Sequence, residues 1–212
     1  MIFALVSLLA MQPVGQKGHS DWIKPDDYPV SALNGRESGY VGFSVLVAPD
    51  GKAEKCDVTS PSAFSDLNDL SCSLVMRRAR FTPAIGADGQ PAYGLFRSWA
   101  SWLVAEDRLT MDRFLKTHPR PSDIDLTLLV KAAQLPAPLD LVVAVDPSGH
   151  IGDCQARSAT VAVQIAQAAC GQLRSQWKTA PGVTAAGKAI ATVQSARVDF
   201  QPDPAGADQA RP

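Results

Sequence analysis

The chain has 212 residues, of which 46% are apolar, and its 20 basic and 21 acidic side chains give a formal net charge of -1. This length fits one or two compact domains, and the composition is that of a globular protein rather than of a disordered or collagen-like chain. A charge this close to zero gives no reason to expect a nucleic-acid partner.

Residues 1–12 are predicted to be a signal peptide for export. Residues 1–11 (MIFALVSLLAM) are almost wholly apolar, but a helix that spans a bilayer needs about 20 residues. The run instead fits the apolar region of a signal peptide, with Ala10 near a cleavage point. No Lys or Arg precedes the run, so a buried N-terminal helix or strand is the alternative.

The sequence repeats itself with a constant offset of 98 residues. Cys56 and Cys72 are 16 residues apart, and so are Cys154 and Cys170. The same offset aligns residues with special backbone geometry: Pro49 with Pro147, Gly51 with Gly149, Pro83 with Pro181, and Gly89 with Gly187. We therefore predict an α+β chain made of two tandem copies of one small unit.

In the first copy, residues 41–47 alternate and are β-branched, which predicts a strand. A Pro-Asp-Gly turn follows, and residues 52–58 return as a second strand. A helix is expected from about residue 65 to about residue 80, and a third strand over residues 95–104.

The second copy repeats this order. Strands are predicted over residues 141–145 and 151–156, a helix over 161–177, and a third strand over 189–200. Residues 125–134 (DLTLLVKAAQ) are predicted to form a helix that opens this copy.

These elements predict the organisation of the chain. The first unit covers residues 26–105, a linker covers 106–122, and the second unit covers 123–203. Residues 204–212 are predicted to be a disordered tail.

The four cysteines allow three disulfide connectivities, and the repeat favours Cys56 with Cys72 and Cys154 with Cys170. Free thiols in a reducing compartment are the alternative. No CxxC motif is present, and the three histidines do not stand at zinc-site spacing from a cysteine. The sequence also lacks GxSxG, Walker, GxGxxG and HExxH motifs. We therefore expect no enzyme, no metal, no cofactor and no small-molecule substrate.

The first unit resembles the C-terminal domain of TonB, the energy transducer of Gram-negative bacteria. The resemblance rests on stretches in the family's order: Tyr28-Pro29-Val30-Ser31-Ala32 for its "YPxxA" opening, Gly39 to Val45 for its first strand, Asp50-Gly51-Lys52-Ala53 for its hairpin, Arg80-Phe81-Thr82-Pro83-Ala84 for its "FxPA", and Asp88-Gly89-Gln90-Pro91 for its "xGxPV". The second unit keeps the Gly149 turn, the cysteines, Pro181 and Gly187, but it lacks the Tyr-Pro opening and resembles a diverged copy.

The resemblance implies a small three-stranded antiparallel sheet packed against helices, in the periplasm, with association with the inner membrane left open. It also implies a protein partner, the plug-side segment of an outer-membrane transporter, which adds as a strand to the sheet edge. The third strand is the expected binding element, with Phe96, Ser98, Trp99, Ser101 and Trp102 as partner-binding residues. Trp99 and Trp102 are three residues apart, so they are expected on opposite faces.

The sequence departs from a complete transducer, because no membrane-spanning helix and no long Pro-rich spacer precede the first unit. A periplasmic binding module is therefore the expected function. The alternative is a structural tandem-domain envelope protein without a transport role, and a homodimer is left open.

Overall fold

The structure is a computed structural model that describes residues 10–18, 22–104, 113, 116, 121–130, 135–158 and 163–203. The chain has an α+β fold, with one large mixed sheet, three two-stranded sheets and few helices among these residues. Residues 1–9 of the predicted signal peptide, most of the linker and the predicted tail from residue 204 lie outside the described residues.

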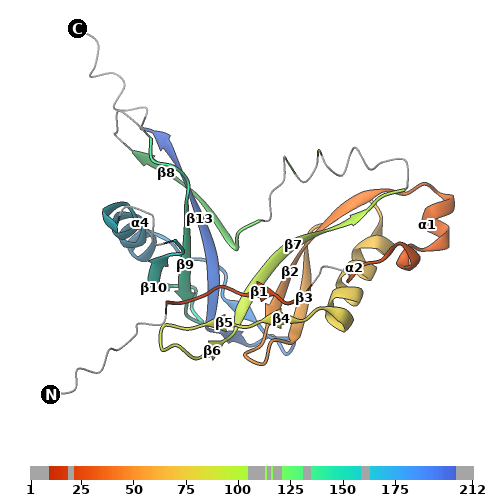
Figure 1. Ribbon diagram of the computed structural model, residues 1–212, viewed down its shortest axis with the longest axis horizontal. Coiled ribbons are helices and arrows are strands. Elements are labelled where there is room, and N and C mark those ends of the chain that lie inside the picture. The colour runs from red at the N-terminus through yellow and green to blue at the C-terminus, as the bar shows by residue number, and fades with distance from the viewer. Residues whose placement is uncertain are drawn as a thin grey trace, which may run out of the picture.

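A seven-stranded sheet in the order β10-β9-β13-β7-β2-β3, with β8 also paired to β13, runs through the molecule. Its N-terminal half-sheet consists of β2 (Gly39–Val47), β3 (Ala53–Ser60) and β7 (Gly94–Trp102). Its C-terminal half-sheet consists of β8 (Ile124–Val130), β9 (Leu139–Val145), β10 (Ile151–Ala156) and β13 (Thr192–Pro202). The two half-sheets meet at one end and splay apart like a V (Figure 1).

One long helix covers each half-sheet, and in Figure 1 the two helices lie on the outer sides of the V. The helix α2 (Ser65–Arg78) packs on β3, and α4 (Val163–Gln176) packs on β10. The shorter elements are η1 (Pro25–Asp27), α1 (Val30–Asn34), β1 (Gly15–Gln16), β4 (Phe81–Thr82), β5 (Ala84–Ile85), β6 (Pro91–Ala92), β11 (Gly182–Val183) and β12 (Ala189–Ile190).

Each half-sheet has its own apolar core under its helix. In the N-terminal half, Val41, Phe43 and Val45 of β2 face Leu67, Leu74 and Val75 of α2, and all six are almost fully buried. In the C-terminal half, Leu141 and Val143 pack with Ala166, Ala169 and Leu173 of α4. Alternate strand residues supply these contacts, as the period of two in the sequence predicts.

The two disulfides link the second strand of each half to its helix. Cys56 of β3 bonds Cys72 of α2, and Cys154 of β10 bonds Cys170 of α4. This is the pairing that the equal spacing in the sequence favours. The elements themselves are also spaced by 98 residues, since α2 ends at Arg78 and α4 at Gln176.

The half-sheets are joined by a parallel bridge between β7 and β13, whereas the sequence predicts a separate sheet in each unit. Gly94 of β7 pairs with Val193 of β13, and Val193 N donates to Tyr93 O at 2.8 Å. Val142 and Val193 of the C-terminal half-sheet pack into the core of the N-terminal half. The two half-sheets are therefore joined by apolar contacts as well as by main-chain pairing.

The predicted helix over residues 125–134 is wrong where the structure describes it. Residues 124–130 form strand β8, which runs parallel to β13 from Ile124↔Ala196 to Val130↔Pro202. Ile124, Leu126 and Leu128 are buried, and the residues between them are exposed. The period of two over these seven residues outweighs the helix-forming residues that follow.

The segment before the first unit runs between the two half-sheets. Met11 is buried in the N-terminal core, and its carbonyl accepts a hydrogen bond from Gln155 Nε2 of β10 at 2.9 Å. Gln12 exchanges two main-chain hydrogen bonds with Ile85, at 3.1 and 2.9 Å. Cleavage after residue 12 would remove these contacts, and the signal peptide stays a prediction.

Candidate protein-binding edge

Strand β7 has two different edges. One edge pairs with β2 over nine residues, from Gly39↔Trp102 to Val47↔Gly94, without any register shift. On its other edge, the described residues supply one pair only, Gly94↔Val193. We call this second edge, over residues 95–102, the β7 edge.

Main-chain groups alternate between the two edges of a strand. Because Tyr93 O accepts from Val193 N of β13, the main-chain groups of the odd-numbered residues 95–101 point to the β7 edge. Those of the even-numbered residues 96–102 point to β2. A strand that pairs along this edge would therefore bond to Leu95 and Ser101 but not to Ser98.

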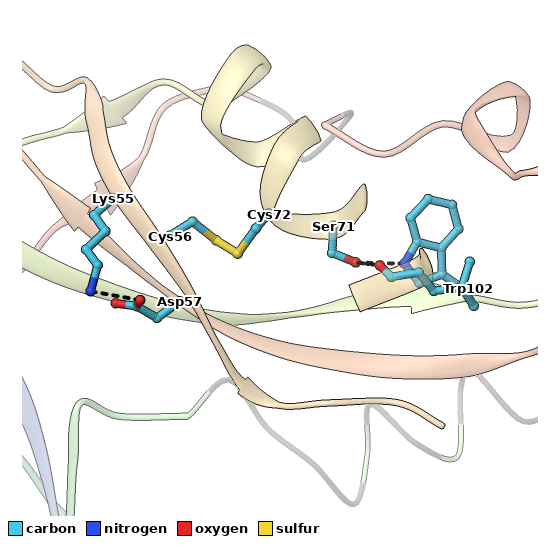
Figure 2. The surroundings of a disulfide bond; sticks show 7 residues. Lys55, Cys56, Asp57, Ser71, Cys72 and Trp102 are labelled. Atoms are coloured by element: carbon cyan, nitrogen blue, oxygen red, sulfur yellow. Dashed lines mark hydrogen bonds and ion pairs between the residues drawn. A yellow bond between two sulfur atoms is a disulfide. The ribbon is translucent and has the colours of Figure 1, made fainter. Parts of the chain in front are cut away.

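The even-numbered side chains of β7 belong to the N-terminal core. Phe96 is 1% exposed and contacts the rings of Trp22 and Phe81, with centroids 5.7 and 4.9 Å away. Trp102 is equally buried, and its Nε1 donates to Ser71 Oγ at 2.8 Å (Figure 2). These two predicted binding residues therefore hold β7 against α2 and the segment that precedes α1.

Ser71 completes this buried arrangement, because its Oγ donates in turn to Leu67 O at 2.7 Å. The ring of Tyr28 lies edge-on to Trp102 at 5.4 Å, and its hydroxyl donates to Glu37 O. Asp27, next to Tyr28, forms a bidentate ion pair with Arg78 at the end of α2. The hydrogen bond from Arg78 lowers the pKa of Asp27 to about 2.

Trp99 lies on the opposite face of β7, as its spacing from Trp102 predicts. It is half-buried and lies directly over Gly42 of β2, where an added Cβ would be 2.7 Å from Trp99 Cζ3. Ser98 and Ser101 are also half-buried. The structure thus brings the five predicted residues onto one strand, with Phe96, Ser98 and Trp102 on the core face and Trp99 and Ser101 on the other.

The outer strands of the sheet are less regular than β7. The β2–β3 ladder has two register shifts, and an ion pair between Lys55 and Asp57 at 2.8 Å lies on β3 (Figure 2). The β9–β10 ladder has a shift between Ile151 and Cys154. Bulges and charges of this kind discourage the addition of another strand, so β7 offers a more regular edge than β3 or β10.

The second regular edge belongs to β8, which the sequence analysis did not find. Strand β8 pairs with β13 alone among the described strands, and it runs in the same direction as β7. Charges act between them: burial raises the pKa of the Asp125 carboxyl of β8, while the Arg97 guanidinium of β7 opposes that rise. The alternation of residues 124–130 was the signal that would have revealed this strand.

The part of the chain that the structure describes contains neither a membrane-spanning helix nor a metal site. None of its helices is long and apolar enough to cross a membrane. Within the same described ranges, no three His, Cys, Asp or Glu side chains come together as metal ligands.

Residues 24–96, which are 73 of the 212 residues, match the family described as "Gram-negative bacterial TonB protein C-terminal". The match covers η1, α1, the β2–β3 hairpin, α2 and the start of β7. It supports a TonB C-terminal domain in the N-terminal half and is consistent with a role in protein interaction at the cell envelope. No curated protein matches the chain, and no solved structure matches it.

Proposed function

We propose that the N-terminal half is a periplasmic protein-binding module, and that its partner adds an extended segment as a strand along the β7 edge. The observation that carries this proposal is the one-sided pairing of a long, regular strand. Strand β7 has nine unshifted pairs with β2 and, among the described strands, a single bridge on its other edge. In strand addition, main-chain hydrogen bonds supply affinity and alternate side chains supply selectivity.

The family match supports the class of partner. It covers the N-terminal half, and the resemblance in the sequence implies the plug-side segment of an outer-membrane transporter as the incoming strand. Trp99 and Ser101 would flank that strand on one face. Phe96, Ser98 and Trp102 act on the other face by holding β7 in place. The chemistry is recognition without catalysis.

We also propose that the C-terminal half is a diverged copy of the same unit. The same close approach occurs in both halves: an added Cβ at Gly51 would be 2.4 Å from Phe81 O, and one at Gly149 would be 2.3 Å from Thr179 O. Both glycines have positive φ, at 81° and 85°. Gly51 and Gly149 are 98 residues apart, and so are Phe81 and Thr179, which supports duplication of one turn together with the segment that it contacts.

A structural envelope protein is the second candidate, and the junction between the half-sheets favours it. The bridge at Gly94 and the burial of Val142 and Val193 in the N-terminal core join the two units into one scaffold. Such a scaffold could hold two envelope proteins together without any role in transport. A homodimer of this scaffold would pair through the same strand edges, those of β7 and β8.

The test of strand addition is a proline at Ser101. Proline has no N–H, and the main-chain N–H of Ser101 points to the β7 edge rather than to β2. The Ser101→Pro variant is expected to lose an outer-membrane transporter that the parent chain retains from detergent-solubilised outer membranes. The matched control is Ser101→Ala, which keeps the N–H and is expected to retain the same partner.

Circular dichroism of both variants separates lost binding from lost folding. If folded Ser101→Pro retains the partner as well as Ser101→Ala does, the partner does not pair with this edge. If the parent chain retains envelope proteins but no outer-membrane transporter, the structural alternative takes over.

A further inference from the structure

A cavity of about 370 Å³ lies between α4 and β10 in the C-terminal half. Its walls include Val163, Ala166, Cys170 and Arg174 of α4, and Cys154 and Ala156 of β10. Small and apolar side chains line its inner part, while the polar side chains of Gln155, Ser158 and Gln167 complete its walls. Val163 and Arg174 are exposed, so the hollow is open to solvent. The volume is in the lower part of the range for small-molecule sites, which is about 300–1,000 Å³.

The lining of the hollow differs from the matching position of the N-terminal half. In the N-terminal half, Asn68 of α2 is hydrogen-bonded to Ser62 three times: its Oδ1 accepts from Ser62 N and Oγ at 2.8 and 2.9 Å, and its Nδ2 donates to Ser62 O at 3.1 Å. The residue 98 positions later is Ala166, which lines the cavity. Ser62 lies in the loop between β3 and α2, so the Asn68 amide ties the helix to that loop, and the methyl group of Ala166 forms no such hydrogen bond.

The hollow is elongated along the helix. The residues of α4 that line it, Val163, Ala166, Gln167, Cys170 and Arg174, recur every three or four positions and so share one face. From Val163 to Arg174 the helix rises by about 16 Å at 1.5 Å per residue. A straight, flexible apolar chain fits this shape better than a compact ring system does.

A fixed cation stands at one end of the hollow. Arg174 Nε donates to Gly152 O of β10 at 2.8 Å, which holds the guanidinium at the strand. No acidic side chain is among the described residues that line the cavity, and none of the described ion pairs involves Arg174. The residue 98 positions earlier is Met76, so the charge belongs to this half alone.

We propose that this groove binds a fatty acid, with the acyl chain between α4 and β10 and the carboxylate on the Nη groups of Arg174. A guanidinium fork matches a carboxylate in geometry and charge. An added peptide strand fits less well, because the register shift between Ile151 and Cys154 breaks the regularity of β10. The proposal concerns a bound ligand rather than a converted substrate, and it is independent of the β7 edge.

Calorimetric titration of the full chain with laurate, below its micelle-forming concentration, tests the proposal. One saturable site per chain is expected. Dodecanol, which has the same chain length without the charge, is expected to bind at least about tenfold more weakly, since a charge-assisted pair is lost. Equal affinity for laurate and dodecanol would overturn the assignment of Arg174.

Two variants place the ligand within the groove. Arg174→Met restores the side chain found at Met76 and is expected to weaken laurate binding by at least about tenfold while leaving dodecanol unchanged. Ala166→Leu fills the hollow and is expected to weaken both ligands. Arg77→Met, on the exposed surface of α2, is the matched control and is expected to change neither.

Three results would overturn the proposal. One is laurate binding that Arg174→Met and Ala166→Leu leave at the parental affinity, because the ligand would then lie elsewhere. Another is the absence of a saturable site in the parent chain. The third is a concentration-dependent dimer in light scattering that Ala166→Leu abolishes, because a second copy would then occupy the groove.

Discussion

The two half-sheets have the same order of elements, but they hold their helices in different ways. In the N-terminal half, Leu67, Leu74 and Val75 of α2 are at most 1% exposed and fill the space above β2. In the C-terminal half, the buried residues of α4 are Ala166, Ala169, Cys170 and Leu173, and a cavity opens next to the disulfide of Cys154 and Cys170. The comparison indicates that large side chains carry more of the packing of α2, while α4 depends more on its disulfide.

The half-sheets differ in their edges as well. Strand β13 is paired on both sides, by β9 along one edge and by β7 and then β8 along the other. Strand β7, at the matching place in the N-terminal half, has a full ladder only with β2 in the described part of the chain. A strand thus already occupies on β13 the place that is proposed for the partner on β7.

The largest expected effect comes from removing one disulfide at a time. The Cys56→Ala/Cys72→Ala and Cys154→Ala/Cys170→Ala variants each open a link with a separation of 16 residues. The chain-entropy model then gives the same loss, about 3 kcal/mol in the free energy of unfolding, for either pair. The local consequence should be unequal: α4 loses hydrogen-exchange protection, whereas α2 keeps most of its own.

Urea denaturation of the full chain measures the global loss, and hydrogen exchange read by mass spectrometry measures the local one. The two double variants are each other's control, because their links have equal sequence separations. Equal loss of protection in α2 and α4 would contradict the view that the two helices are held differently.

The next effect concerns the junction between the half-sheets. In Gly94→Ala, the added Cβ would lie 2.6 Å from Val14 Cγ2, 2.8 Å from Ala84 Cβ and 2.9 Å from Val193 O. Because three separate segments crowd this position, we expect a loss of about 1–3 kcal/mol in the free energy of unfolding. The Val193 amide, which donates to Tyr93 O, should exchange faster.

The matched control is Gly171→Ala in the interior of α4. No atom lies within 4 Å of a Cβ added there, so we expect a gain of up to about 1 kcal/mol from the lower helix cost of alanine. If Gly94→Ala keeps the Val193 amide protected and matches the parent in stability, the half-sheets do not depend on close approach at this bridge.

The sequence alone was enough to place the two long helices and the long strands other than β8. Strand β10 was predicted with the bounds that it has, and α2 and α4 each end within two residues of the prediction, because strand alternation and helical spacing are local patterns. The helix predicted over residues 125–134 was wrong because the spacing of Leu126 and Leu129 also fits a helix. Only the burial of Ile124, Leu126 and Leu128 against β13 settles that ambiguity.

The junction and the candidate edge depend on contacts that a local pattern does not contain. Gly94 and Val193 are far apart in the sequence, and a glycine there is equally compatible with a turn. The opposite faces of Trp99 and Trp102 followed from their spacing, but the contact of Trp102 with Ser71 on α2 did not. Likewise, the cavity beside α4 depends on residues of α4 and β10 that come together only in the fold, such as Ala166 and Cys154.

The smallest expected effect compares two carboxylates that are 98 residues apart. Asp27 accepts hydrogen bonds from Arg78 Nη2 and Lys24 N, both at 2.8 Å, and the Arg78 bond is the main cause that lowers its pKa from 3.8 to about 2. At Asp125, burial is the main cause that raises the pKa above 3.8. The position that matches Arg78 in the C-terminal half is Gln176, which carries no charge.

The two shifts have opposite consequences for stability. A lowered folded-state pKa means that Asp27 stabilises the fold above about pH 4, and that this contribution is lost as the pH falls from about 4 to about 2. A raised folded-state pKa means that the contribution of Asp125 is present below about pH 4 and is lost as the pH rises through that pKa.

Urea denaturation at neutral pH should therefore find Asp27→Asn less stable than the parent chain and Asp125→Asn more stable. Near pH 2 both differences should shrink, since Asp125 is then protonated in every state and Asp27 has lost much of its charge. Two variants that shift stability in the same direction at neutral pH would show that these matched positions have the same electrostatic environment after all.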